Sequence, residues 1–564
     1  MRTILCGVNA RFSHMNLAIR YLEGACRGIC ETTVKEYTIN DPVQHIIWDL
    51  TACGGDVYCF SSYIWNIDIL LRAAEGVKKA ISSSIILFGG PEASYSADEL
   101  LQEQPFIDHV LSGEGEKSLP AFIRALQGTG DIQSAPNLYY RREGKTAFTH
   151  EAEPNDMDSL PDAYTTLEEG RMIYYESSRG CPYHCTFCLS SRSEKPRYRS
   201  LEKTFADLSR FISAGAKQVK FVDRTFNADK DRAYAIFNWL IEKGRNMRAG
   251  THALTNFHFE IAGHLLDDDT LTLLEKAPKG LFQFEMGVQS LNEETLHAIS
   301  RKQDFGRIEH AVSRLKRSGN IHVHLDLIAG LPCETEESFK ATFERVFALQ
   351  PDTLQLGFLK LLKGSRLREE AEKYGIQYGS FAPYEVISTP GLPVPTMQKI
   401  RRVCSALDML YNKGGLQAAI HYMAEKENSA FLFLLQFAAY ADSIGIQMHG
   451  QGREGAAKAL LEYAEAAYPG DEACRDLIRY AYFKGAGRRT MQTSLGDGFD
   501  AEERETVYKA LARLHPGMAW KQILVCGFNT DVMGYEEGKG VKYERTYVLF
   551  DYATGETTKL IIGN

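Results

Sequence analysis

The sequence lacks the features that would place it in a membrane or along a nucleic acid. It has no uninterrupted apolar run of about 18 residues, the length that a membrane-spanning helix needs. Positive charge is not in excess, because 64 Lys and Arg residues face 73 Asp and Glu residues, for a net charge of −9. Broad electrostatic capture of nucleic acid or of an anionic membrane is therefore not favoured, although a local basic patch is compatible with these totals.

Cysteine is sparse. Twelve cysteines in 564 residues are far fewer than a secreted disulfide scaffold carries. The first residues run directly into a strand-like segment without the long apolar region of a signal peptide. We therefore expect a cytoplasmic protein whose thiols are reduced, bound to metal or buried.

The first 168 residues predict one domain and a linker. In residues 1–150 short apolar runs alternate with helical stretches, which predicts a doubly wound parallel α/β sheet of the Rossmann type. The clearest of these strands are expected at 3–8, 57–61, 84–90 and 109–116. Acidic residues and two prolines in 151–168 are typical of a linker.

The rest of the chain predicts two further domains. Residues 169–365 hold six strand–helix units, which indicate a partial (β/α)6 barrel. Residues 366–564 predict a mainly helical extension that ends in a small β hairpin or sheet. After the last barrel strand, we expect several side chains near the barrel mouth: Lys363, Tyr374, Tyr378 and Tyr384.

Three cysteines at the start of the barrel carry the strongest chemical signal. Cys181, Cys185 and Cys188 have the spacing C-x3-C-x2-C and follow the first predicted barrel strand. Three thiolates on one short loop suit an iron–sulfur cluster, and a [4Fe–4S] cluster with three protein ligands keeps one iron open for chemistry. The alternative is a zinc site, but no second cysteine pair at the usual distance is evident.

This motif and its position resemble the radical S-adenosylmethionine (SAM) superfamily over residues 170–365. The resemblance implies a [4Fe–4S] cluster on the three cysteines and SAM bound at its open iron. It implies that SAM is cleaved to a 5′-deoxyadenosyl radical, with electrons from a donor such as flavodoxin or ferredoxin. By the same resemblance, six residues at strand ends are expected to bind SAM: Asp223, Glu260, Gln289, Ser290, Arg301 and Asp326.

These polar residues also have a simpler interpretation, since any one of them can be a solvated strand end. The family often has glycine where Cys333 stands. That thiol is expected to be a buried passenger, or alternatively to lie near the active site.

The first domain resembles the cobalamin (B12)-binding domain of one large branch of the superfamily. Small residues at strand ends allow the backbone to approach a bulky corrinoid closely. The resemblance implies cobalamin contacts from Ser61, Ser62, Tyr63, Gly89, Gly90, Pro91, Glu92, Gly113 and Glu114. A generic nucleotide site, or no ligand, is the alternative. The loop after the first strand has His14 without the D-x-H-x-x-G pattern of domains that donate a histidine, so we expect no protein histidine to ligate cobalt from below.

The architecture implies a cobalamin-dependent methyltransferase that acts on an unactivated carbon of a small molecule or peptide. Three alternatives remain open at this point. One is a cobalamin-assisted rearrangement, cyclisation or oxidation. Another is a radical lyase on a small metabolite or modified nucleobase, with a vestigial cobalamin domain. The third is a non-catalytic corrinoid or iron–sulfur carrier or sensor, which would have no need of Glu260, Gln289 or Arg301.

Overall fold

A computed structural model describes residues 1–165, 167–168, 170–192, 195–248, 254–485, 495–514 and 520–560. The chain divides into two compact units: residues 1–335 with 357–393, and residues 336–356 with 394–564. Among the described residues, no helix is both long and apolar enough to cross a membrane.

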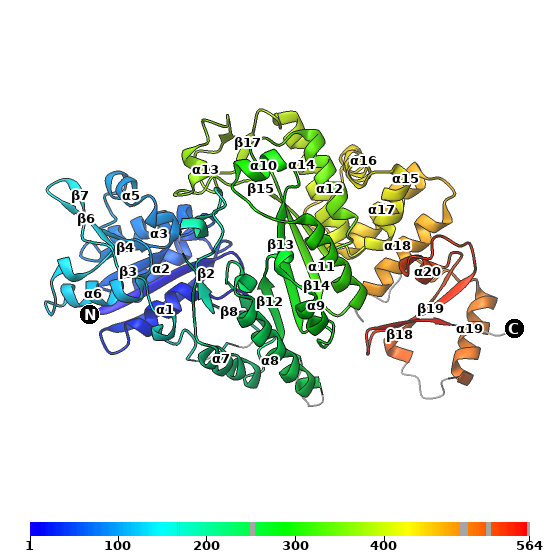
Figure 1. Cartoon of the computed structure of the whole chain (residues 1–564), viewed down its shortest axis with the longest axis horizontal. Coiled ribbons are helices and arrows are strands. Elements are labelled where there is room, and N and C mark those ends of the chain that lie inside the picture. Colours follow the sequence, from blue (N-terminus) through cyan, green and yellow to red (C-terminus); the bar gives the residue numbers. More distant parts are fainter. Residues whose placement is uncertain are drawn as a thin grey trace. The chain divides into compact units, whose positions relative to one another are not determined.

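The N-terminal sheet has seven strands in the order β2-β1-β3-β4-β5-β6-β7 (Figure 1). The first five are parallel: β1 (Arg2–Asn9), β2 (Glu31–Thr38), β3 (Val57–Ser61), β4 (Ile85–Gly89) and β5 (His109–Leu111). An antiparallel hairpin of β6 (Leu138–Arg142) and β7 (Lys145–Phe148) extends the β5 edge. The predicted doubly wound parallel sheet is confirmed, and the polar edge strand β2 and this hairpin are additions to it.

Two separate hydrophobic cores explain the uniformly apolar strands of this sheet. Tyr58 and Phe60 of β3 belong to one core, whereas Val57 and Cys59 belong to the other. Alternate side chains of a strand point to opposite faces, so β3 must be apolar throughout when helices cover both faces. The covering helices are α1 (Leu17–Ala25), α2 (Val43–Ala52), α3 (Ile67–Ala80), α5 (Ala97–Glu103) and α6 (Gly115–Leu126).

The central sheet has six strands in the order β15-β14-β13-β12-β11-β8, the predicted partial barrel. The strands are β8 (Ile173–Tyr175), β11 (Gln218–Phe221), β12 (Asn256–Glu260), β13 (Phe282–Gln289), β14 (His322–Ala329) and β15 (Thr353–Phe358). The main intervening helices are α7 (Leu201–Ser213), α8 (Lys230–Arg248), α9 (Asp268–Leu274), α11 (Phe305–Ser318) and α12 (Glu336–Phe347).

The two faces of this sheet differ sharply in chemistry. In β13, the residues on one face are fully buried and apolar, and those on the other are half-buried Gln283, Glu285, Gly287 and Gln289. The apolar face is a packed aromatic core, in which the rings of Phe221 and Phe259 stack at 4.5 Å. A closed (β/α)8 barrel fills its interior with branched apolar side chains. This partial barrel instead presents polar side chains on its inner face, as a ligand site requires.

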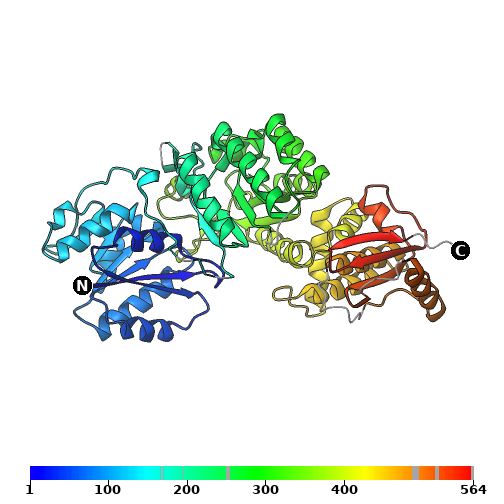
Figure 2. The ribbon, with the colours of Figure 1, turned by 90° about the horizontal axis from the view of Figure 1, so that it is seen from below.

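The C-terminal unit is mainly helical and carries a small antiparallel sheet (Figure 2). Its sheet has the order β18-β19-β20, with β18 (Ile523–Phe528), β19 (Thr546–Asp551) and β20 (Glu556–Leu560). Phe550 of β19 contacts the rings of Tyr480 and Phe483. The helices are α14 (Val394–Leu407), α15 (Gln417–Glu427), α16 (Ala430–Ser443), α17 (Arg453–Ala467), α18 (Glu472–Gly485), α19 (Ala501–Leu514) and the short α20 (Val532–Glu536). The predicted mainly helical extension with a small sheet is confirmed.

A buried ion-pair network joins the N-terminal sheet to the first strand of the central sheet. The guanidinium of Arg171 lies 3.0 Å from Glu36 and 2.8 Å from Glu168, and the side chains of Arg171 and Glu36 are each only 8% exposed. Arg171 also donates to the backbone carbonyls of Phe12 and His14, at 3.1 and 2.8 Å. This one side chain therefore fixes the loop that follows β1.

We expect Arg171→Ala to lower the free energy of unfolding by about 3 kcal/mol, because it leaves Glu36 buried with fewer partners. This loss is near the low end of the range for breaking a buried ion pair, because Arg20 still pairs with Glu36 at 2.6 Å. The measurement is the urea midpoint of the first transition. The control is Arg2→Ala, whose pair with Glu31 is exposed and should matter little. Equal losses in the two variants would contradict the structural role of Arg171.

Candidate active site

The cysteine loop begins directly after the short strand β9 (Ser178–Arg179), and its backbone is hydrogen-bonded to distant segments. The Thr186 N–H donates to the Ile299 carbonyl at 3.0 Å, and the Thr186 carbonyl accepts from the Leu367 N–H at 2.8 Å. Cys181 and Cys185 are buried, and Cys188 is half-buried. The loop is thus a preformed element that holds three thiols at the carboxyl end of the barrel strands.

Two polar side chains reach the cysteine sulfurs from neighbouring elements. The Thr225 hydroxyl lies 3.4 Å from Sγ of Cys181, and Nη1 of Arg301 donates to Sγ of Cys185 at 3.8 Å. Burial raises the pKa of the Cys185 thiol, and the charge of Arg301 acts in the opposite direction. A thiolate ligand is favoured beside such a cation.

A cavity of about 150 Å³ adjoins this loop and is lined by residues of β12, β13, β14 and the loops that follow the strands. Four of the six predicted SAM-binding residues line it: Glu260, Gln289, Arg301 and Asp326. Its other lining residues are Tyr183, Arg224, Thr225, Ile261, Ala262, His264, Glu285, Gly287 and Lys302. Arg301 therefore belongs both to the cavity and to the surroundings of Cys185.

The other two predicted SAM-binding residues, Asp223 and Ser290, are not among the residues that line the cavity. The carboxylate of Asp223 is buried and accepts hydrogen bonds from the hydroxyls of Ser177 and Ser178, at 2.7 and 2.5 Å. It thus ties the end of β11 to the strand that leads into the cysteine loop. Ser290 is fully buried and donates to Glu334 at 3.2 Å.

The turn after β13 explains why glycine and glutamine occur together there. Gln289 has a φ of +68°, and its Oε1 is buried without a hydrogen-bond partner among the described residues. A Cβ on Gly287 would come 2.2 Å from Nε2 of Gln289, so a larger residue there would displace this amide. Gln303 holds the turn by donating to the carbonyls of Val288 and Ser290, at 3.0 and 2.9 Å. An unpartnered buried amide oxygen beside the cavity is what a bound ligand would satisfy.

The sequence interpretation did not single out a polar layer on the inner face of the strands. Lys220 and His258 both contact Oε2 of Glu285, at 3.2 and 2.9 Å. Tyr183 and His264 form another pair, with 3.0 Å between Oη and Nε2. The signal that could have found this layer is the alternation of apolar and polar residues along the strands. Polar residues at every second position of a core strand indicate that one face of the strand lines a cavity.

Two glutamates at the same register of adjacent strands have opposite electrostatic environments. Glu260 of β12 is paired in register with Glu285 of β13. Burial raises the pKa of Glu260 to about 7. Burial acts in the same direction on Glu285, but the hydrogen bond from His258 and the charge of Lys220 outweigh it and lower that pKa to about 2. Near neutral pH, Glu285 is therefore ionised, whereas Glu260 can hold or release a proton.

We expect Glu260→Gln to stabilise the cofactor-free protein increasingly as the pH rises. Ionising Glu260 in the fold becomes costly between its ordinary pKa of 4.5 and its raised pKa of about 7. The gain should therefore grow by about 2 kcal/mol between about pH 5.5 and pH 8. Urea midpoints at the two pH values measure it.

The matched variant Glu285→Gln should instead destabilise the protein, by about 3 kcal/mol at both pH values. The pKa of Glu285 is lowered to about 2, so its stabilising charge is already complete at about pH 5.5. The same sign of change in both variants would contradict the two assigned environments.

The predicted cobalamin residues follow the carboxyl ends of β3, β4 and β5. The backbone N–H and the hydroxyl of Ser62 both donate to the Gly89 carbonyl at 2.7 Å. Gly90 has a φ of +94°, and a Cβ there would come 2.5 Å from the Ser62 carbonyl oxygen. Only glycine allows this close approach of two strand ends. The edge available to a ligand is therefore formed largely by backbone.

Glu92 and Glu114, two predicted cobalamin contacts, are already engaged by other side chains. Glu92 is buried and accepts a hydrogen bond from the hydroxyl of Tyr384, whose ring lies 4.4 Å below the guanidinium of Arg368. Glu114 is ion-paired with Arg197, and with Arg179 at 3.3 Å. These carboxylates position the strand-end loops. Lys363 and Tyr384, expected near the barrel mouth, both lie close to Glu92, with 3.8 Å from the ammonium to the carboxylate.

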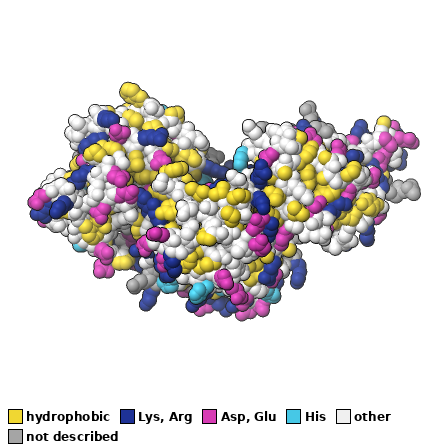
Figure 3. All heavy atoms as spheres, turned by 90° about the horizontal axis from the view of Figure 1, so that it is seen from above, with side chains coloured by type: hydrophobic (Ala, Val, Ile, Leu, Met, Phe, Trp, Pro, Cys, Tyr) yellow, Lys and Arg dark blue, Asp and Glu magenta, His cyan; other side chains and the backbone are white. Residues whose placement is uncertain are grey.

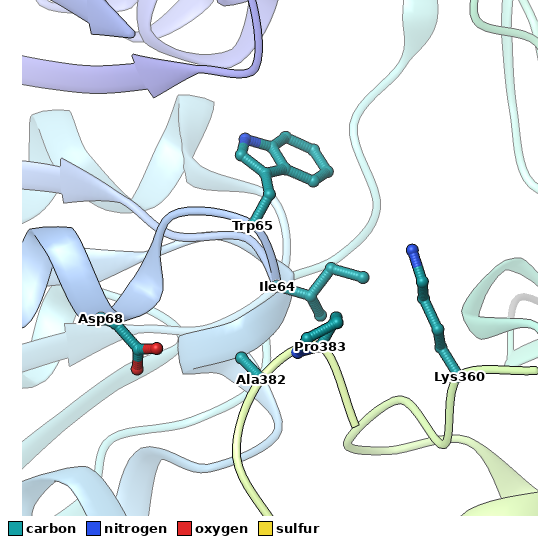
Figure 4. Close-up of a pocket in the computed structure, with 6 residues that line it drawn as sticks. All are labelled: Ile64, Trp65, Asp68, Lys360, Ala382 and Pro383. Atoms are coloured by element: carbon teal, nitrogen blue, oxygen red, sulfur yellow. The ribbon is translucent and has the colours of Figure 1, made fainter. Parts of the chain in front are cut away.

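A second cavity, of about 270 Å³, opens beside the loop after β3 (Figure 4). Trp65 and Lys360 flank it, with Ile64 and Pro383 between them in this view. Trp65 is held by a hydrogen bond from its indole N–H to the Val8 carbonyl at 3.2 Å and by stacking on Tyr63 at 4.4 Å. Asp68 and Ala382 complete the lining.

Comparison with protein families identifies three segments of the chain. The B12 binding domain model matches residues 4–123, and the Radical SAM superfamily model matches residues 175–346. The chain is a radical SAM protein with a B12-binding domain. These domains imply SAM, a [4Fe–4S] cluster and cobalamin as cofactors. A third model, a protein of unknown function (DUF4080), matches residues 372–550.

Related proteins are similar over part of this radical SAM protein. An uncharacterized methyltransferase of Pyrococcus horikoshii is 26% identical over 316 residues, which are 52% of this chain and 65% of the relative. The cobalamin-dependent radical SAM methyltransferase TokK of Streptomyces tokunonensis is 24% identical over 364 residues, 60% of this chain and 52% of TokK. The chain thus spans between half and two thirds of the length of these curated relatives.

Solved structures share the fold. The cobalamin-dependent SAM radical enzyme OxsB with aqua-cobalamin bound superposes with a TM-score of 0.60 at 14% identity, and the match covers 92% of this chain and 84% of OxsB. At this identity, the likeness shows a shared fold.

Proposed function

We propose that this protein is a radical SAM enzyme whose [4Fe–4S] cluster is held by Cys181, Cys185 and Cys188. One observation carries the proposal. Arg301 lines the cavity and also donates to Sγ of Cys185, so the cysteine loop and the cavity form one site. A cluster at the cysteines and a ligand in the cavity would therefore be neighbours.

The cavity residues suit the parts of SAM. Arg301 provides a cation for the methionine carboxylate, and Gln289 offers an unpartnered amide oxygen. Glu260 and Asp326 offer carboxylates to the ribose hydroxyls. Asp223 and Ser290 do not line the cavity but hold neighbouring segments, through Ser177 and Glu334 respectively. With cluster and SAM bound, the site would supply a 5′-deoxyadenosyl radical, which these side chains orient and shield from water.

We further propose cobalamin-dependent methyl transfer to an unactivated carbon of a small molecule or peptide. The B12-binding domain and the similarity to TokK support this reaction over the others. Ser61, Ser62, Tyr63, Gly89, Gly90, Pro91 and Gly113 would contact the cobalamin, and Glu92 and Glu114 would position these loops. The electron donor would be flavodoxin or ferredoxin, and the location the cytoplasm.

Domain boundaries and partners belong to the same proposal. Residues 1–150 form the cobalamin domain, 151–168 the linker, 169–365 the barrel and 366–564 the extension.

On the described part of the face in Figure 3, side chains of both charges are intermingled. This pattern supports a small substrate over a nucleic acid.

A cobalamin-assisted rearrangement or cyclisation would use the same residues without net methyl transfer. A radical lyase would use the cluster and SAM but not cobalamin. A carrier or sensor is less well supported, because it needs no cation such as Arg301 between a thiol and a cavity.

We expect anaerobically reconstituted protein to bind about four irons, and the triple variant of Cys181, Cys185 and Cys188 to Ala to bind almost none. Iron and sulfide analysis with the absorbance spectrum measures the cluster. The expectation that Cys333 is buried is wrong, because this residue is exposed in the turn after β14. Cys333→Ala is therefore the matched control and should not change iron content. Retention of the cluster by the triple variant would refute the ligand assignment.

With a reductant and SAM, the reconstituted protein should release 5′-deoxyadenosine, which chromatography detects. Methyl transfer should also yield S-adenosylhomocysteine when substrate is present. Deoxyadenosine without S-adenosylhomocysteine under those conditions would favour the rearrangement or the lyase. No cleavage in several reducing systems would favour the sensor.

Tyr384→Phe should weaken cobalamin binding several-fold, because it removes the hydrogen bond to Glu92 beside Gly90 and Pro91. Absorbance titration with hydroxocobalamin measures this affinity. Tyr378→Phe is the matched control, since the Tyr378 ring also lies under Arg368, at 5.4 Å, and the described contacts of Glu92 do not include it. Equal affinities in the two variants would show that Glu92 has no part in the site.

A further inference from the structure

Three side chains on the inner face of β13 and β14 converge, and only Asp326 among them has a proposed contact with SAM. Glu285, His324 and Asp326 each place one ligand atom so that all three atoms lie within 4.8 Å of one another. No other group of three His, Cys, Asp or Glu residues in the described part of the chain does so. Glu285 and Asp326 line the cavity beside the cysteine loop, and His324 is the neighbour of Glu285 in the strand register.

Two of these side chains, His324 and Asp326, each have a buried atom without a hydrogen bond. Nε2 of His324 lies 3.0 Å from Oδ1 of Asp326, yet neither atom makes a hydrogen bond of acceptable geometry to any described residue. Both atoms are buried. Buried polar atoms without hydrogen bonds need an explanation, and a bound ion between them would provide it.

Two further side chains hold Glu285 in its orientation. Lys220 and His258 both contact Oε2, and Oε1 accepts no hydrogen bond from the described residues. Outer partners of this kind hold a metal-ligating carboxylate in place. Lys220 and His258 thus fix the carboxylate through Oε2, and Oε1 has no such partner.

We propose that Glu285, His324 and Asp326 bind one divalent metal ion at the back of the cavity. One imidazole nitrogen and two carboxylates suit Mn²⁺, Zn²⁺ or Fe²⁺, and a site of three protein ligands keeps positions open for another donor. The open side faces the cavity that Glu285 and Asp326 line, so that donor would be an oxygen or nitrogen of a molecule held there. The three ligands include no thiol, so the cluster and the ion would have different ligands.

The inference does not rest on the proposed SAM chemistry, because the ion needs neither the cluster nor SAM. It changes one assignment within the cavity. One oxygen of Asp326 would belong to the ion, which leaves the other for the ribose.

Manganese binding to the full-length, cluster-reconstituted protein tests the site. Mn²⁺ is the probe because it prefers nitrogen and oxygen donors to thiolates. Binding is measured as the loss of the electron paramagnetic resonance signal of unbound Mn²⁺. We expect about one Mn²⁺ per chain. His324→Gln, Glu285→Gln and Asp326→Asn should each weaken binding by about tenfold or more.

The matched control is His322→Gln. His322 lies on the same strand, two residues before His324, and is exposed. This variant should bind Mn²⁺ as the unchanged protein does. Iron content measured on the same samples should stay at about four per chain in every variant, which separates failure of this inference from failure of the cluster assignment.

Two results would overturn the inference. One is the absence of stoichiometric binding of Mn²⁺, or of Zn²⁺ measured by elemental analysis, up to about 1 mM. The residues would then form only a buried ion pair. The other is binding that His324→Gln and Glu285→Gln leave unchanged, which would place the ion elsewhere. Circular dichroism and elution volume verify that the variants are folded.

Discussion

The aromatic packing on the outer face of β12 and β13 decides which side chains reach the cavity. Phe259, Phe282 and Phe284 pack against Phe237 of α8, and their alternation leaves the intervening positions on the inner face. A slip of one residue would exchange the two faces and bury the charged side chains in the aromatic core. The cost of that exchange fixes the register, and the register places Glu260, Glu285 and Gln289 in the site.

Within the site, a short distance separates side chains of different chemistry. Glu260 and Glu285 are neighbours across two strands, yet only Glu285 has Lys220 and His258 beside it. The raised pKa of one and the lowered pKa of the other follow from this difference in partners. One cavity thereby offers both a permanent charge and a group that titrates near neutral pH.

In the first domain, two carboxylates that were expected to contact cobalamin are bound by other side chains. Glu92 and Glu114 bind Tyr384 and Arg197, which come from much later in the chain. Tyr384 lies within the segment that matches the family of unknown function, so that segment begins by holding a strand-end loop of the B12-binding domain. This contact gives part of an uncharacterised family a structural role.

The sequence alone determined the alternation of strands and helices, the three cysteines at fixed spacing, and four residues of the cavity, because these signals are local or belong to short motifs. It could not determine the partners of Asp223 or Glu92, since these depend on residues that are distant in the chain. Nor did it single out Lys220, His258 and His324, which become a group only when four strands align in register. The three thiols are close because the chain between them is short. The polar layer exists only because the tertiary structure buries the opposite face of each strand.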